Sequence, residues 1–90
     1  MDYQREFKNA LISQPNCILG KNGITHEFVI HVLQLLKRHK IIKIKALRSV
    51  ATRANIHKLA IEISKLTNSH LLDIRGKSII LTKYSIEKFN

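Results

Sequence analysis

Apolar side chains change their spacing several times along the chain, and each change predicts a new element. They recur at helical intervals over residues 3–13, and Pro15 ends that pattern. The apolar run 16–19 is typical of a buried strand and stops at Gly20. We therefore expect a helix followed by a short strand.

A second amphipathic segment follows, and both of its ends carry recognisable signals. Thr25 stands at the expected N-cap, where a hydroxyl accepts a hydrogen bond from a free amide of the first turn. Glu27 places a negative charge near the positive end of the helix. The cations of residues 37–40 suit its negative end. We expect a helix that starts after Thr25 and closes on these cations.

Apolar and basic side chains then alternate over residues 41–47, which is typical of a strand with one buried face. Helical spacing returns in the next segment, with an N-cap at Ser49 or Thr52 and a left-handed stop at Asn68. We expect the buried stripe of this third helix to consist of Ile56, Leu59, Ala60, Ile63 and Leu66.

The remaining residues predict a β-hairpin. The short strands 71–74 and 78–81 are joined at Arg75-Gly76-Lys77, and residues 84–90 are expected to form a frayed tail. The order helix, strand, helix, strand, helix, strand, strand predicts one compact α/β domain over residues 1–90. We expect a four-stranded mixed sheet packed on helices.

Two strand–helix–strand steps in one sheet bring several loops to a common edge. The carboxyl ends of the first three strands meet there, and ligands of open α/β sheets bind at such edges. This edge receives the loops 20–23, 47–49 and 75–77, each with a basic residue. Lys43 and Lys45 are expected on a face of the sheet. The opposite edge is expected to carry Lys37, Arg38 and Lys40.

The charge balance indicates a polyanionic partner. Sixteen Lys and Arg face six acids, which gives a net charge of +10, and residues 28–61 contain no acid. A membrane fits less well, because no segment pairs a basic face with a Trp- or Phe-rich one. No apolar run approaches the roughly 18 residues of a membrane span, and the start of the chain lacks an apolar signal core. We expect a cytoplasmic protein.

The segment Gly20-Lys21-Asn22-Gly23 offers a place for a phosphate between a strand and a helix start. Its glycines allow a tight turn and a close approach to the main chain, and Asn22 tolerates left-handed geometry. Free amides of the next helix favour an anion, and Lys21 adds a positive charge. A bare G-x-x-G is also a common turn, so its position at the basic edge is what favours binding.

Other chemistry has little support in the sequence. Gly76-Lys77-Ser78 matches the end of a Walker A loop, but Leu71 stands where its first glycine belongs. The five histidines show no metal-ligand spacing, and no pair of acids suggests acid–base catalysis. Cys17 lies in an apolar run, as a small buried residue would. We expect no enzyme activity, no metal, no cofactor and no small-molecule substrate.

Several of these segments together resemble the CRM domain, named for chloroplast RNA splicing and ribosome maturation. The resemblance rests on residues 15–25, Glu27 and the runs 41–47 and 71–81, and it covers residues 5–83. It implies a fold similar to the carboxyl-terminal domain of translation initiation factor three. The G-x-x-G loop would clamp RNA backbone, as the corresponding loop does in KH domains. Thr82 departs from the family pattern, which has an aromatic residue before the basic position 83.

The resemblance implies RNA as the partner, and a single free-standing copy looks like the ribosome-associated type that binds large-subunit precursor RNA. A small architectural protein that coats duplex DNA or structured RNA is the alternative. The sequence does not indicate an oligomeric state. Taken together, loop, edge and resemblance predict RNA contacts from Gly20, Lys21, Asn22, Gly23, Thr25, Lys43, Lys45, Arg48, Arg75, Gly76 and Lys77, with a secondary basic patch of Lys37, Arg38 and Lys40.

Overall fold

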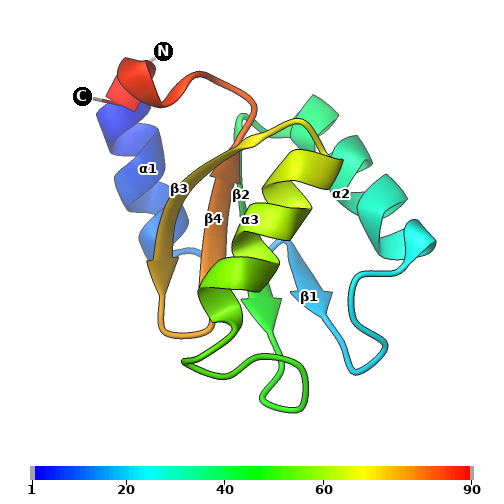
Figure 1. Cartoon of the computed structure of the whole chain (residues 1–90). Helices are drawn as coiled ribbons and strands as arrows, with labels where there is room; N and C mark the ends of the chain where they lie inside the picture. The colour runs from blue at the N-terminus through cyan, green and yellow to red at the C-terminus, as the bar shows by residue number, and fades with distance from the viewer. Residues whose placement is uncertain (1, 90) are drawn as a thin grey trace.

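The computed structural model describes residues 2–89 and has the predicted order of elements, with one further turn of 3-10 helix at the end (Figure 1). The mixed α/β architecture predicted from the sequence is confirmed. The elements are α1 (Tyr3–Ile12), β1 (Cys17–Leu19), α2 (His26–Arg38), β2 (Ile41–Ala46), α3 (Ile56–Leu66), β3 (His70–Arg75), β4 (Ser78–Thr82) and η1 (Ile86–Phe89).

The four strands form one mixed sheet in the order β1-β2-β4-β3. β1 and β2 are parallel, whereas β4 runs antiparallel to both of its neighbours, so β3 points the same way as β1 and β2. The connection through α3 therefore crosses over β4, which enters the sheet last and fills the gap between β2 and β3. The carboxyl ends of β1, β2 and β3 lie at one edge, as expected.

Helices cover both faces of the sheet (Figure 1). Because side chains alternate along a strand, Ile42, Ile44 and Ala46 all face α2 and α3. The core on this side is completed by Val32 and Leu36 of α2, Ala60 and Ile63 of α3, and Ile79 and Leu81 of β4. The other face of the sheet packs against α1.

Local signals fix most element ends. The hydroxyl of Thr25 accepts a hydrogen bond from the Phe28 amide at 3.1 Å, which confirms the predicted N-cap of α2. Asn68 has a φ of 51°, the left-handed stop expected after α3. In the hairpin, Arg75 pairs with Ser78 across a two-residue turn, and Gly76 has a φ of 59°. A glycine at the first turn position with positive φ fits a type II′ turn.

The third helix differs from its prediction at two places. It begins only at Ile56, with Asn55 at the N-cap, so neither Ser49 nor Thr52 caps it. Thr52 instead pairs with Asn55 inside the preceding loop: its amide donates to the Asn55 side chain at 2.7 Å. Leu66, expected in the buried stripe, is 51% exposed, whereas Ile63 and Thr67 on either side of it are buried. The last residue of α3 therefore lies outside the core-facing stripe.

The expected frayed tail is wrong for residues 84–89. Tyr84 and Phe89 pack edge-to-face against Tyr3 of α1, each with ring centroids 5.3 Å apart, and Phe89 also contacts Phe7. Phe89 is buried. This contact joins the two ends of the described chain, and a local sequence pattern cannot reveal it. Residue 90 lies outside the described residues.

Candidate nucleic-acid interface

Three loops meet at the carboxyl edge of the sheet, at the bottom of Figure 1. Backbone hydrogen bonds tie them together. The Leu47 amide donates to the Leu19 carbonyl at 3.1 Å, and the Ala46 amide donates to the Lys77 carbonyl at 2.8 Å. The first bond joins the ends of β1 and β2, and the second joins β2 to the β3–β4 turn. The structure thus confirms the predicted convergence of the three loops.

The loop of residues 20–23 is a closed turn in which the two glycines differ. The Gly23 amide donates to the Gly20 carbonyl at 2.9 Å, and the Gly23 carbonyl accepts from Thr25 at 3.1 Å. Gly23, not Asn22, takes the left-handed conformation, with a φ of 74°. Gly20 has no positive φ, and a Cβ there would meet no atom within 4 Å. The backbone therefore favours glycine at position 23 but not at position 20.

The start of α2 adds free hydrogen-bond donors beside this loop. The Phe28 amide is used by the Thr25 cap, whereas the amides of His26 and Glu27 find no acceptor among residues 2–89. Lys21 extends into solvent from the loop. These amides and the ammonium can together receive an anion, and the Glu27 carboxylate limits the positive charge on one side.

An apolar hollow adjoins the loop. Ile18 and Leu47 flank it with 56% and 40% of their surface exposed, and half-buried Phe28 forms part of its wall. His31 also lines it. Our sequence interpretation missed Ile18 because it treated the run 16–19 as a buried strand. The two-residue period of a strand would have shown that Ile18 points away from Cys17 and Leu19.

The cations of this edge differ in their exposure to solvent and in their contacts with the rest of the protein. Lys21, Lys45 and Arg48 are exposed. Among residues 2–89 only two ion pairs form, and neither includes these three. Arg75 is engaged, because its guanidinium lies 2.6 Å from the Asp73 carboxylate. Lys77 is half-buried and contributes its carbonyl to the bond with Ala46.

Lys43 shares a strand face with Lys45, as predicted, but its ammonium is engaged within the fold. It donates to the Leu11 carbonyl at 2.9 Å and to the Ser13 carbonyl at 3.0 Å. Both carbonyls lie at the carboxyl end of α1, where a positive charge also balances the helix dipole. Lys43 therefore fastens α1 to the sheet, and its charge is less available to a ligand than that of Lys45.

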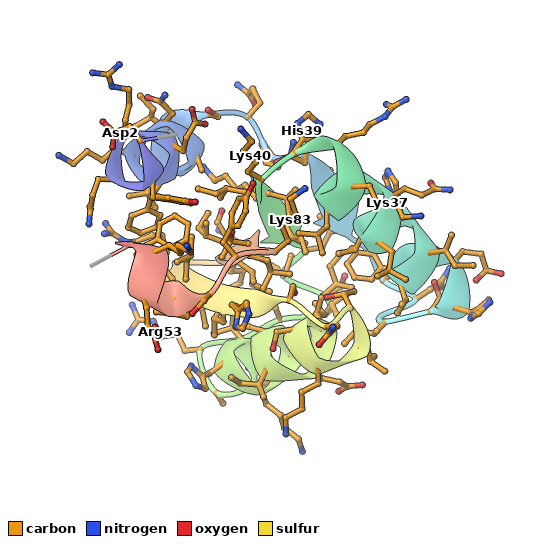
Figure 2. The ribbon with its side chains drawn as sticks, turned by 90° about the horizontal axis from the view of Figure 1, so that it is seen from above. Asp2, Lys37, His39, Lys40, Arg53 and Lys83 are labelled. Carbon is orange, nitrogen blue, oxygen red and sulfur yellow. The ribbon has the colours of Figure 1, made fainter. Side chains whose placement is uncertain are left out.

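The predicted secondary patch lies at the opposite edge, as expected. Lys37 and Arg38 end α2, and Lys40 precedes β2. Figure 2 looks onto this end of the molecule, where Lys83 also lies. The Lys83 amide donates to the Lys40 carbonyl at 3.4 Å, so the segments that follow α2 and β4 are neighbours.

The histidines lie at the surface of the domain, whereas the cysteine lies in its core. All five histidines are exposed, and residues 2–89 contain no cluster of three potential metal ligands. Burial raises the pKa of the Cys17 thiol to about 11, so this cysteine is a core residue. Over the same residues, no helix has the length and apolar character that a membrane span needs.

Comparison with known proteins now identifies the family. Residues 4–83 match the CRS1/YhbY (CRM) domain. The chain belongs to the CRM family. CRM domains are an RNA-binding family, which supports RNA as the partner of this CRM protein. Among curated proteins, no sequence matches the chain.

A solved structure agrees with the CRM fold. It is the solution structure of the hypothetical protein SAV1595 from Staphylococcus aureus, for which RNA binding has been suggested. The two chains are 23% identical and superpose with a TM-score of 0.76, over 93% of the CRM protein and 85% of the other chain. At this identity the likeness shows that the two proteins share a fold.

Proposed function

We propose that this CRM protein binds RNA backbone at the carboxyl edge of its sheet and takes part in maturation of the large ribosomal subunit in the cytoplasm. The observation that carries this proposal is the presence of glycine at position 20. Neither its φ nor its surroundings require glycine, yet it stands beside the exposed Lys21 and the free amides of α2. A position without a side chain lets a phosphate approach the main chain closely.

The charges around the loop extend this contact along a strand of RNA. Lys45 and Arg48 are exposed on the same edge and are free to meet neighbouring phosphates. Phosphate contacts position an RNA without reading its sequence. The hollow with Ile18, Phe28 and Leu47 supplies apolar surface beside the clamp, which suits a ribose or an unpaired base.

The ribosomal role rests on family membership. Crosslinking in cells, followed by sequencing of the bound RNA, tests it directly. We expect crosslinks on large-subunit precursor RNA, and co-sedimentation of the protein with precursor particles at moderate salt. Absence from all ribosomal fractions would remove the assembly role and leave RNA binding in place.

Binding itself is tested with purified protein. Lys21→Glu should weaken binding of a structured RNA by about tenfold or more, because it replaces an attraction to phosphate by a repulsion. Lys65→Glu, on the exposed side of α3, is the matched control. Duplex DNA bound as tightly as RNA at equal salt, with no effect of Lys21→Glu, would instead support an architectural DNA-coating protein.

A further inference from the structure

The amino edge of the sheet carries a second group of cations, far from the candidate loop. Lys37, Arg38, Lys40 and Lys83 are all exposed there. Among residues 2–89, none of them lies within 4 Å of a carboxylate, since the two ion pairs in this part of the chain involve Arg5 and Arg75. We call Lys37, Arg38, Lys40 and Lys83 the amino-edge patch.

Helix electrostatics explains only half of this patch. Lys37 and Arg38 lie in the last turn of α2, where cations balance the negative end of the helix dipole. Lys40 and Lys83 lie outside every helix. The Lys83 ammonium lies 5.8 Å from the centre of the Tyr84 ring, but no carboxylate within residues 2–89 neutralises either charge. A surface with such unneutralised cations attracts a polyanion.

The fold holds the two halves of the patch together. Thr82 is fully buried, and its hydroxyl donates to the Lys40 carbonyl at 2.8 Å. The Lys83 amide donates to the same carbonyl at 3.4 Å. Thr82 thus links the end of β4 to the start of β2 and places Lys40 beside Lys83.

The two basic surfaces face away from each other. β2 runs from the amino-edge patch to Leu47, a length of roughly 17 Å for six residues. α2 spans a similar distance, from the Thr25 cap to Lys37 and Arg38. An RNA segment must therefore extend over roughly 17 Å or more to contact both surfaces.

We propose that the amino-edge patch is a second RNA-contact surface, so that one molecule of the protein holds two RNA segments at once. This proposal rests on the proposed function, because it takes the loop edge as the first RNA site. The second site would contact phosphates alone, since the patch consists of cations. It would therefore bind more weakly and lose affinity more completely with salt.

Native mass spectrometry with a short RNA hairpin tests the proposal by counting RNA and protein chains in each complex. We expect the wild-type protein to bind two hairpins per chain at low salt. Lys40→Glu combined with Lys83→Glu should weaken the second hairpin by about tenfold or more and leave the first within about twofold. Lys21→Glu should have the opposite effect, with the first hairpin lost and the second retained.

A matched control separates local contact from net charge. Lys58→Glu combined with Lys65→Glu changes the charge equally on the exposed side of α3 and should leave both hairpins bound. One hairpin per wild-type chain at low salt, or equal loss in both double variants, would overturn the second site. Loss of neither hairpin in Lys21→Glu would overturn the proposed function instead, so the two failures are distinguishable. Circular dichroism melting confirms that each variant is folded.

Discussion

Gly20 and Gly23 stand three residues apart in one turn but are glycine for different reasons. Alanine at position 23 must adopt a left-handed φ, which costs about 1 kcal/mol. Alanine at position 20 meets open space and should change the free energy of unfolding by less than about 0.5 kcal/mol. We expect Gly20→Ala to lower RNA affinity nonetheless, because its methyl group occupies the surface that a phosphate approaches.

Urea unfolding and RNA titration of both variants check this prediction. If Gly20→Ala binds RNA as well as the wild type does, the close approach of phosphate at this position is wrong, and the loop is only a turn.

Lys43 and Lys45 lie on one face of β2 but differ in their contacts, because only the Lys43 ammonium is hydrogen-bonded within residues 2–89. Lys43→Met removes the two hydrogen bonds to the end of α1 and should lower the free energy of unfolding by about 1–2 kcal/mol. Lys45→Met removes an exposed charge, so it should lower RNA affinity and leave stability within about 0.5 kcal/mol. Denaturation and binding measured side by side distinguish the two roles. Equal stability of the two variants would contradict the fastening of α1 by Lys43.

Residue roles could be predicted from the sequence where the cause is local. Thr25 caps its own helix, and Asn68 ends its own helix, so neighbouring residues are enough to identify both. The ammonium of Lys43 bonds to carbonyls 30 and 32 residues away, and nothing near it in the chain points to them. The sequence therefore predicted the correct face for Lys43 but did not predict that its ammonium is hydrogen-bonded within the fold.

Among the elements, η1 is the one that the sequence did not predict. Its Phe89 is 8% exposed and contacts two rings of α1. Phe89→Ala should lower the free energy of unfolding by about 3 kcal/mol, because it leaves a cavity between the two ends of the chain. Ile86→Ala, at a residue 39% exposed, is the control and should cost less than about 1 kcal/mol. Similar midpoints for the two variants in urea would mean that η1 does not stabilise the fold.

The order of elements along the chain was predictable because the spacing of apolar residues changes from one element to the next. The arrangement of the strands in the sheet was only partly predictable. Strand–helix–strand connections join parallel strands, and this rule placed three carboxyl ends at one edge. It did not reveal that β4 inserts between β2 and β3, since hairpin pairing fixes only one of its neighbours. The sequence also predicted too early a start for α3. Thr52 and Asn55 bond to each other within a loop that resembles a helix start in sequence.

For the whole molecule, the excess of positive charge predicts a steep dependence of RNA binding on salt. Each phosphate contact releases counterions, which contributes about 0.7 to the slope of log affinity against log salt on single strands. Lys21→Gln combined with Arg48→Gln should therefore reduce the slope by about 1.4. Lys58→Gln is the control, and we expect its slope to equal that of the wild type. Fluorescence anisotropy across a salt series measures the slopes of the wild type and of both variants. A wild-type affinity that does not change with salt would exclude a phosphate clamp.

The contact between α1 and η1 also determines how the domain can be connected to other chains. The Gln4 side chain donates to the Phe89 carbonyl, so the first helix and the last turn lie side by side, as the two ends do in Figure 1. They lie at the side of the sheet away from the loops of residues 20–23 and 47–49. A copy of this fold can therefore be inserted into a surface loop of a host protein, or closed into a ring by a short peptide, with its RNA-facing edge still open to solvent.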